Sequence, residues 1–362
     1  MRLLISAGGT GGGVYPALSV ASELMNADFG LPNGAPAIRN PQSEILWVGS
    51  VGGMEAEIVR RAGLPFTAIH GGGLHGVGWR MALNAVHLAF GLVEAVRLVR
   101  RFRADALLVT GGFVTAPVAL AAWLNRVPIL VYLPDIEPAL AVKWISRLAR
   151  RIAVTTEASR RYFAGRAVVV TGYPTRPELA RASRGEAVRH FDLDPNRLTV
   201  LVTGGSRGAR SINRAVFAAL PDWLQDYQVI HLSGQLDWKE AEAARAALPA
   251  HLRARYHAFP FLHEMGLALA AAEVVVSRAG ASALGEYPLF GLPAILVPYP
   301  HAWRYQKVNA DYLVERGAAL RLNDEDLAAQ LAAVVRSLLG AARRLAQMRR
   351  AAQSAATPGA AQ

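Results

Sequence analysis

Two glycine-rich segments of the chain are suited to holding phosphate groups. Gly8–Gly13 (GGTGGG) follows the apolar run Leu3–Ala7, and Gly204–Gly208 (GGSRG) follows the run Leu198–Thr203. Glycine lets the backbone approach a phosphate closely, and a helix that follows offers free N–H groups and the positive end of its dipole. Either turn could instead serve only to pack a helix against a sheet.

Neither glycine segment matches the commonest dinucleotide or P-loop motif. Val14 stands where G-x-G-x-x-G needs its last glycine, and no acidic residue follows Ile45–Gly49 to bind an adenosine ribose. No lysine follows either segment, as a P-loop requires. These differences argue against a nicotinamide-dependent dehydrogenase and a P-loop nucleotidase.

A third segment, Ser277–Glu286 (SRAGASALGE), is suited to binding a nucleotide. We expect it to run from the end of a strand into a helix, at the sheet edge where open α/β sheets bind ligands. Its small residues leave room, its amides can hold a diphosphate, and Glu286 can accept hydrogen bonds from both ribose hydroxyls. The alternative is that Glu286 pairs with a nearby arginine.

A fourth segment, His301–Ala310, follows another strand end and carries polar side chains that can bind sugar hydroxyls. Within it, Trp303 is more typical of packing than of a sugar platform. His263 and Glu264 begin a zinc-binding pattern, but position 267 is Leu rather than His. Together with the absence of cysteine, this leaves no expected metal site.

These segments need parallel sheets to position them, and the hydrophobic pattern predicts two. Short apolar runs alternate with helical patterns, which is typical of a parallel sheet with helices on both faces. The expected strands are Arg2–Ser6, Ile45–Gly49, Ala106–Thr110, Pro128–Leu133, Leu198–Thr203, Val229–Leu232, Glu273–Ser277 and Ala294–Pro298. The expected helices of the first half are Pro16–Met25, Met54–Arg61, Val114–Leu124 and Ala139–Leu148.

The recurrence of a strand followed by a glycine turn predicts two Rossmann-like α/β domains around a central cleft. Two prolines and a glycine interrupt regular structure in Thr171–Pro177. We therefore expect an N-terminal domain over residues 1–172 and a C-terminal domain over residues 173–340. Residues 341–362 are expected to form a C-terminal helix and a frayed tail.

Composition limits the partners and the compartment. The chain has 362 residues, 52% of them hydrophobic, and a net charge of +12 that comes almost entirely from arginine. Arginine suits diphosphates and anionic lipid headgroups because its planar fork binds phosphate oxygens in pairs. The sequence has no zinc-finger spacing, RNA-binding aromatic motif or long basic block, so no nucleic-acid partner is expected. The absence of cysteine fits a reducing cytoplasm, and no secretory signal is visible.

The segment Met81–Phe102 has two interpretations. It is apolar up to Val93 and then basic, while His87 and Glu94 argue against a membrane span. It is either a buried helix with a solvated basic end or an apolar patch rimmed by arginine that lies on an anionic lipid surface.

Taken together, five motifs resemble glycosyltransferase family 28, over residues 3 to about 339. Those motifs are Gly8–Pro16, Gly111–Val114, Gly204–Ala209, Ser277–Glu286 and His301–Ala310. The resemblance implies the two-domain GT-B fold. It also implies an inverting cell-wall transferase that moves N-acetylglucosamine from UDP-N-acetylglucosamine to lipid I, giving lipid II. Such an enzyme needs no metal or other cofactor to bind its donor and works as a peripheral protein on the cytoplasmic face of the cell membrane.

The resemblance also implies roles for individual residues. The implied substrate-binding residues are Thr10, Gly11 and Gly12 near the diphosphate and sugar, Asp135 in the acceptor-side loop, Arg176 and Ser206 on the diphosphate, Leu262 at the uracil through its backbone, Ala281, Ser282, Ala283 and Leu284 around the diphosphate and nucleoside, Glu286 on the ribose, and Gln306 on the sugar hydroxyls.

The acceptor side departs from the family pattern. The histidine of the family's first loop, a candidate general base, is Gly13 here, and the family's H-E-Q-N reads Tyr132–Asp135. Tyr305 replaces the first Gln of a family pair, and His75 replaces an Arg. We therefore predict that Asp135 or Glu137 is the base; the alternative is that they cap the helix expected from Ala139. A related transferase with another lipid or glycan acceptor, and a non-catalytic protein that binds nucleotide sugar, stay open.

Overall fold

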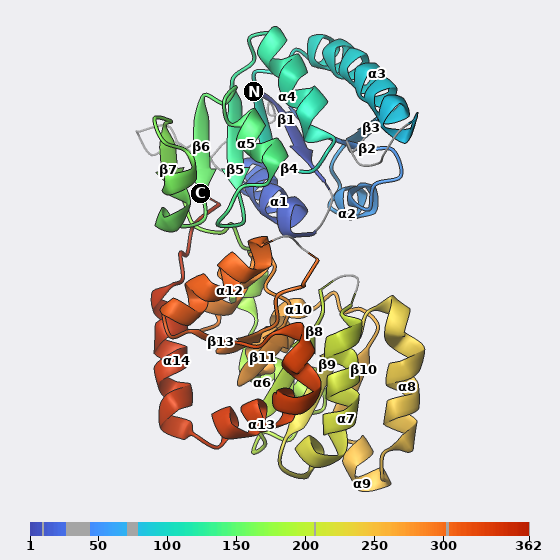
Figure 1. Ribbon diagram of the computed structural model, residues 1–362, viewed down its shortest axis with the longest axis vertical. Coiled ribbons are helices and arrows are strands. Elements are labelled where there is room, and N and C mark those ends of the chain that lie inside the picture. Colours follow the sequence, from blue (N-terminus) through green and yellow to red (C-terminus); the bar gives the residue numbers. More distant parts are fainter. Residues whose placement is uncertain (9–10, 27–43, 71–78, 206–207, 302–303, 362) are drawn as a thin grey trace. The chain divides into compact units, whose positions relative to one another are not determined.

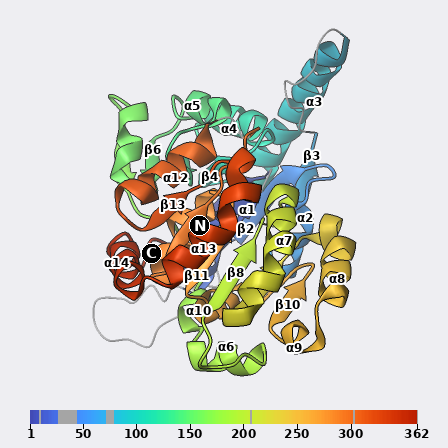
Figure 2. The same ribbon diagram turned by 60° about the horizontal axis from the view of Figure 1, so that its bottom comes forward.

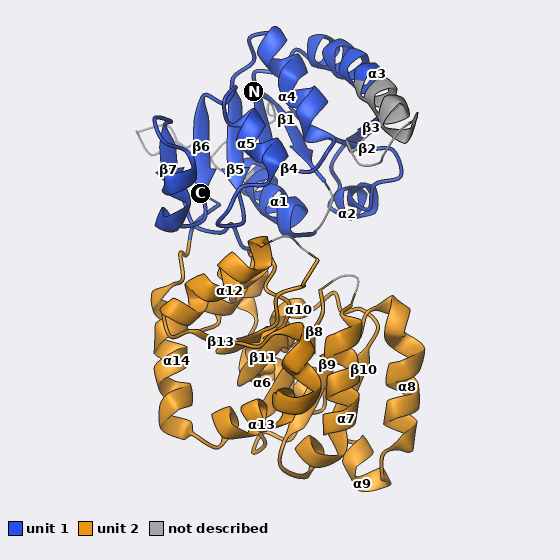
Figure 3. Cartoon of the chain, in the orientation of Figure 1, with its two compact units in different colours: residues 1–176, 359–362 blue, residues 177–358 orange. Residues whose placement is uncertain are grey.

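The structure is a computed structural model that describes residues 1–8, 11–26, 44–70, 79–205, 208–301 and 304–361, with side chains left undescribed at 79–88. Its contacts divide the chain into two compact units (Figure 3). Unit 1 comprises Met1–Arg176 with Gly359–Gln362, and unit 2 comprises Pro177–Pro358. The structure divides the chain after Arg176, whereas the sequence led us to expect the boundary after residue 172. The C-terminal helix belongs to unit 2.

Unit 1 is a parallel α/β sheet with strand order β3-β2-β1-β4-β5-β6-β7 (Figure 1). Its strands are β1 (Arg2–Ala7), β2 (Glu44–Ser50), β3 (Phe66–Ile69), β4 (Ala106–Gly111), β5 (Ile129–Leu133), β6 (Arg151–Val154) and β7 (Val168–Val170). Its α-helices are α1 (Gly11–Asn26), α2 (Glu55–Arg61), α3 (Trp79–Phe102), α4 (Thr115–Leu124) and α5 (Leu140–Ile145).

The strands of unit 1 are apolar on both faces because helices cover both faces of the sheet. Leu4 and Leu107 belong to the core shared with α3 and α4. Leu3 and Leu108, their neighbours in sequence, belong to the core shared with α1. The side-chain period of two thus divides one apolar run between two cores.

Unit 2 is a second parallel sheet, with strand order β10-β9-β8-β11-β12-β13. Its strands are β8 (Thr199–Thr203), β9 (Gln228–Leu232), β10 (Tyr256–Phe259), β11 (Val274–Ser277), β12 (Ala294–Leu296) and β13 (Ala319–Arg321). Its α-helices are α6 (Arg184–His190), α7 (Arg210–Asp226), α8 (Trp238–Ala247), α9 (Ala250–Arg253), α10 (Met265–Ala271), α11 (Glu286–Leu289), α12 (Tyr305–Glu315), α13 (Leu327–Leu339) and α14 (Ala342–Ser354). Helix α7 lies beside α8 and α9 in both views (Figures 1 and 2).

The expected fold class is confirmed. The differences concern element ends, short strands that were not predicted and the segment 277–286. The predicted helix Ala139–Leu148 is wrong at its end, because α5 stops at Ile145. The Nη2 atom of Arg166 donates to the carbonyl oxygens of Ser146 and Ala149, at 2.9 and 2.7 Å. After Ile145 the backbone amides bond three residues back, as in Leu148 N–H to the Ile145 carbonyl at 2.9 Å, so tighter turns braced by Arg166 replace the last helical turn.

Candidate functional site

The first glycine turn lies where the strand order of unit 1 reverses. Strands β1 and β4 are parallel neighbours, and the chain continues outward from them in opposite directions. Such a switch point is where open α/β sheets bind ligands. The Gly8 amide donates to the Gly111 carbonyl at 3.1 Å. A Cβ atom on Gly112, which has φ +100°, would lie 2.8 Å from the Gly8 carbonyl oxygen, so only glycine allows the two turns to meet.

Helix α1 begins in the glycine turn itself, at Gly11. The Thr110 hydroxyl donates to the Gly13 carbonyl at 2.8 Å and ties the first turn of α1 to β4. A Cβ atom added to Gly13 would lie 3.3 Å from Thr110 Oγ1, so a side chain here needs a small shift of that hydroxyl. Gly11 and Gly12 are therefore at the switch point, while Thr10 lies outside the described residues.

A buried carboxylate, which the sequence analysis missed, supports the same turn. Glu55 is 1% exposed, and its Oε1 accepts from the Ser50 amide at 2.8 Å and from the Ser50 hydroxyl at 2.7 Å. A Cβ atom on Gly8 would lie 3.1 Å from that oxygen. Nothing local separates Glu55 from exposed Glu57 on the same helix, so only the packing reveals it.

Asp135 and Glu137 follow the carboxyl end of β5, and both are partly exposed. Beside them, the buried Tyr132 hydroxyl bonds with Thr155 Oγ1 at 2.7 Å and donates to the Gly172 carbonyl at 3.1 Å. Burial raises the pKa of Tyr132, against the lowering effect of the Thr155 hydrogen bond and with a further rise from the Asp135 charge. Helix α5 has Ala139 at its N-cap position, so neither carboxylate is the N-cap residue.

Arg176, which ends the first segment of unit 1, lies against the first turns of α1. Its guanidinium carbon is 4.8 Å from the centroid of the Tyr15 ring. Three residues earlier, the Tyr173 hydroxyl is 3.5 Å from the Gly12 carbonyl oxygen. The segment that leads out of unit 1 is thus held to the helix that follows the first glycine turn.

In unit 2 the second glycine turn occupies the corresponding position, after β8 and next to β11. Gly208 has φ +75°, and a Cβ atom there would lie 2.3 Å from the Ser233 carbonyl oxygen. This contact places the turn directly against the end of β9 and excludes a side chain. Helix α7 begins at Arg210, and Ser206 lies outside the described residues.

A buried polar network holds the start of α7 to β9. The Asn213 amide nitrogen donates to the Ser233 carbonyl at 2.8 Å and to Asp237 Oδ2 at 2.9 Å. Its oxygen is 3.0 Å from Nε2 of His231, whose Nδ1 is 2.9 Å from the Tyr256 hydroxyl. Buried polar groups that are all hydrogen-bonded give a rigid arrangement. The network therefore holds in place the backbone at Ser233, against which the second glycine turn packs.

The network predicts a pH dependence of stability. Burial lowers the pKa of His231 to about 3, while an unfolded histidine titrates near 6.5. Between these pH values the unfolded chain binds a proton that the folded protein does not. The free energy of unfolding therefore has its full value above about pH 6.5 and falls as the pH decreases. From pH 7.5 to 5.5 we expect this group to remove roughly 1 kcal/mol of the free energy of unfolding.

Urea unfolding at the two pH values checks this expectation. His231→Gln cannot titrate, so its loss over the same interval should be smaller than that of the wild type by this amount. His251→Gln, a change at an exposed histidine of α9, should behave as the wild type. Equal pH slopes for wild type and His231→Gln would contradict the assignment.

The segment Ser277–Glu286 forms two short turns instead of the predicted single helix. Residues Ala281–Leu284 make the 3-10 turn η4, and Glu286 begins the four-residue helix α11. The intervening Gly285 has φ −122° and ψ −48°, outside the helical range, which interrupts the helix. Glu286 is 8% exposed.

The arginine of this segment has its own structural partners. Arg278 pairs with Asp324 at 2.5 Å, donates to Ser211 Oγ at 2.7 Å and stacks on Tyr299. Asn309 Nδ2 donates to the Ala279 carbonyl at 3.1 Å. These contacts fix the segment between α7, η5 (Asp324–Asp326) and α12.

The remaining predicted residues lie on loops and the start of α12. Leu262 is buried in the loop between β10 and α10. The Gln306 side-chain oxygen accepts from the Tyr299 amide at 2.8 Å, so the amide nitrogen is the part of Gln306 suited to bind a sugar hydroxyl. Trp303 lies outside the described residues.

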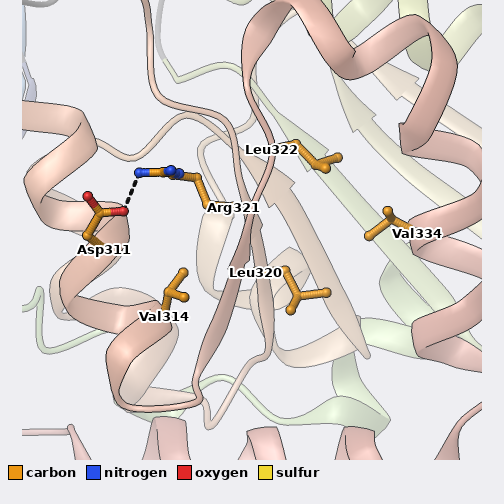
Figure 4. A pocket seen from close by; sticks show the side chains of 6 residues that line it. All are labelled: Asp311, Val314, Leu320, Arg321, Leu322 and Val334. Carbon is orange, nitrogen blue, oxygen red and sulfur yellow. Dashed lines mark hydrogen bonds and ion pairs between the residues drawn. The ribbon is translucent and has the colours of Figure 1, made fainter.

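A pocket of about 430 Å³ in unit 2 lies away from the predicted residues, beside the edge strand β13. Figure 4 shows Arg321 directed toward Asp311, with which it pairs at 2.5 Å. The lining residues are Asp311, Val314, Leu320, Arg321, Leu322 and Val334. Within the described part of the chain, no group of three or more His, Cys, Asp or Glu is placed to hold a metal. No described helix is both long and apolar enough to cross a membrane.

Comparison with known proteins relates both units to one family. Residues 3–154 match the glycosyltransferase family 28 N-terminal domain, and residues 199–362 match the glycosyltransferase family 28 C-terminal domain. A Roseiflexus protein is 42% identical over 91% of this chain and 84% of its own length. A Moorella thermoacetica protein is 38% identical over 99% of this chain and 96% of its own. Both are named UDP-N-acetylglucosamine–N-acetylmuramyl-(pentapeptide) pyrophosphoryl-undecaprenol N-acetylglucosamine transferase.

Solved structures agree on the fold. The crystal structure of Acinetobacter baumannii MurG has a TM-score of 0.75 at 24% identity, covering 99% of this chain and 96% of that one. The complex of Staphylococcus aureus MnaA with UDP has a TM-score of 0.71 at 14% identity, covering 100% of this chain and 94% of that one.

Proposed function

The chain belongs to glycosyltransferase family 28, and on this premise we propose that it transfers N-acetylglucosamine from UDP-N-acetylglucosamine to undecaprenyl-diphospho-N-acetylmuramyl-pentapeptide (lipid I), giving lipid II. One observation supports this proposal most directly. Two relatives that match 91% and 99% of this chain carry the name of that activity. In each unit a glycine turn also lies at the switch point of a parallel sheet.

Unit 2 is proposed to bind the donor. The backbone of Leu262 binds the uracil, and Glu286 accepts hydrogen bonds from the ribose hydroxyls. Residues 281–284 surround the diphosphate and nucleoside, Ser206 binds the diphosphate, and the Gln306 amide binds the sugar. Contacts of Arg278 and Asn309 hold the segment 277–286 rigidly. This rigidity supports the proposal, because a preorganised site loses less entropy on binding.

The leaving diphosphate is proposed to be stabilised by Arg176 and by the N-terminus of α7. The acceptor hydroxyl attacks the anomeric carbon from the face opposite the UDP, so the bond to the diphosphate breaks with inversion. Negative charge grows on the departing diphosphate, where a guanidinium and free amides lower the barrier. Because η4 and α11 are each four residues long, we assign the dipole effect to the 17-residue helix α7.

Unit 1 is proposed to bind the lipid-linked acceptor, with Asp135 or Glu137 as the base. Thr10, Gly11 and Gly12 lie near the donor diphosphate and sugar in this proposal. The two carboxylates follow β5 at the sheet edge that also carries the first glycine turn. Gly13 has no side chain to accept the proton that the family histidine would take, so another group must do so.

We propose that neither a metal nor another cofactor takes part. The charge of the diphosphate is met by Arg176 and backbone amides instead. Transfer is therefore expected to continue unchanged in the presence of EDTA.

The partner surface is proposed to be an anionic membrane, on its cytoplasmic face, with no nucleic acid involved. Helix α3 packs Ala95 and Val99 into the core and exposes Phe90 (62%) and Val93 (47%) on its other side. Arg97 and Arg100 continue this exposed stripe. An apolar stripe followed by arginines suits contact with anionic lipid.

Replacing the two exposed apolar side chains tests the membrane contact. In Phe90→Ser/Val93→Ser, co-sedimentation with phosphatidylglycerol vesicles is expected to weaken roughly tenfold, because less apolar surface leaves water. Val169→Ser, which changes an exposed apolar side chain of β7, is the control. Unchanged binding of the double variant would contradict the contact.

Transfer of labelled N-acetylglucosamine from its UDP donor to a soluble lipid I analogue tests the function itself. Product formation supports the assignment. UDP binding with transfer only to another lipid or glycan acceptor would indicate a related transferase. UDP binding without any transfer would indicate a nucleotide-sugar-binding protein that does not catalyse.

A further inference from the structure

The Tyr15 ring lies close to both the backbone of Gly11 and the guanidinium of Arg176. A Cβ atom on Gly11 would be 3.0 Å from Cε2 and 3.2 Å from Cδ2 of Tyr15, so the ring packs closely on this glycine. The Arg176 guanidinium carbon lies over the ring, 4.8 Å from its centroid. The ring is thus in contact with two groups that are distant from each other in sequence.

The surroundings hold this arrangement in place. The Ser19 hydroxyl donates to the Tyr15 carbonyl at 3.0 Å within α1. Tyr173, which is 1% exposed, reaches the Gly12 carbonyl oxygen at 3.5 Å. The Arg176 side chain therefore extends from a segment that is itself held beside the first glycine turn.

Stacking on a ring and binding a phosphate use different parts of a guanidinium. The attraction to the ring uses the face of the guanidinium, whereas the N–H groups lie in its plane. A phosphate can then be bound by two parallel N–H donors. A long arginine side chain otherwise loses rotamer entropy when it is fixed, and stacking in the free protein meets part of that cost before the donor binds.

We propose that Tyr15 is a positioning residue, whose ring orients Arg176 so that the N–H edge of its guanidinium meets the donor diphosphate. This inference rests on the proposed function, because it takes a nucleoside diphosphate sugar as the ligand of Arg176. Tyr15 links the first glycine turn to stabilisation of the leaving group without touching the donor itself.

A double-mutant cycle on UDP binding tests the coupling. Tyr15→Leu removes the ring face and is expected to weaken UDP binding, measured by calorimetry, about 5- to 10-fold. Tyr15→Phe keeps the ring and should stay within about twofold of the wild type. In an Arg176→Ala background, Tyr15→Leu should change UDP affinity by less than about twofold, since coupled residues are non-additive.

A matched control separates positioning from simple loss of an aromatic contact. Arg161 stacks on Tyr162 with a guanidinium-to-centroid distance of 5.0 Å, elsewhere in unit 1, and Tyr162→Leu should leave UDP affinity unchanged. Equal losses from Tyr15→Leu with and without Arg176 would overturn the inference, as would Tyr15→Phe binding as weakly as Tyr15→Leu.

The cycle also distinguishes this inference from the assigned reaction. UDP affinity does not depend on which acceptor is used, so the cycle can succeed although lipid I is not a substrate. If the wild-type protein did not bind UDP at all, the donor assignment and this inference would both be overturned.

Discussion

Replacing Asp135 by Asn and Glu137 by Gln in one variant is expected to lower kcat roughly 10²–10⁴-fold, the usual contribution of a general base. The donor KM should change little, because the carboxylates act on the acceptor hydroxyl and not on UDP. Both substitutions keep the size and shape of the side chains, so the fold of unit 1 should persist. Steady-state transfer to a lipid I analogue measures the effect.

The single variants then show which carboxylate is the base. The variant of the base should account for most of the loss in kcat, and the other should retain most of the activity. Glu157→Gln, a change at an exposed carboxylate of unit 1, is the control. Full turnover by the double variant would exclude both residues as the base.

Glu286→Gln should produce the largest effect on the donor side. Hydrogen bonds to a charged group contribute about 1.5–3 kcal/mol each. Since the carboxylate is proposed to accept from two ribose hydroxyls, we expect kcat/KM for UDP-N-acetylglucosamine to fall roughly 100-fold. A glutamine keeps one acceptor oxygen but carries no charge, so some binding should remain.

A donor that lacks the ribose 2′-hydroxyl makes this test specific. The wild-type enzyme should lose roughly tenfold in kcat/KM with the 2′-deoxy donor, whereas Glu286→Gln should distinguish the two donors much less. Glu325→Gln, at an exposed position of unit 2, should behave as the wild type. If Glu286→Gln kept the full preference for the 2′-hydroxyl, Glu286 would not be the ribose ligand.

The two units differ in how far they keep the family pattern. On the donor side, the segment 277–286 and Gln306 are retained. The structure holds the segment by the Arg278–Asp324 ion pair and a buried hydrogen bond from Asn309, and it holds Gln306 by a hydrogen bond from the Tyr299 amide. On the acceptor side, Gly13 replaces a histidine, and Thr110 Oγ1 would lie 3.3 Å from a Cβ atom there. The acceptor-side chemistry is therefore where substitution experiments will be most informative.

The sequence by itself determined the fold class and indicated the segments that we propose to bind ligands. Apolar runs of strand length, helical periodicity and glycine after the first strand of each half are local signals, so they can be read along the chain. They located β1, β2, β4, β5, β8, β9, β11 and β12 with errors only at their ends. The strands that were not predicted are β3, β6, β7, β10 and β13, which have three or four residues each. Strands β11 and β12 are equally short, but the longer apolar runs Glu273–Ser277 and Ala294–Pro298 made them visible.

Tertiary structure alone decided which residues support the proposed ligand-binding segments. Gly112 meets Gly8, buried Glu55 lies against the first glycine turn, and Arg176 stacks on Tyr15. Each contact joins residues that are far apart in sequence, and no local pattern distinguishes Glu55 from Glu57 or Tyr15 from Tyr162. Such pairs form because the sheet order brings strand ends together and close packing leaves room for one arrangement, which is a property of the assembled core and not of any segment.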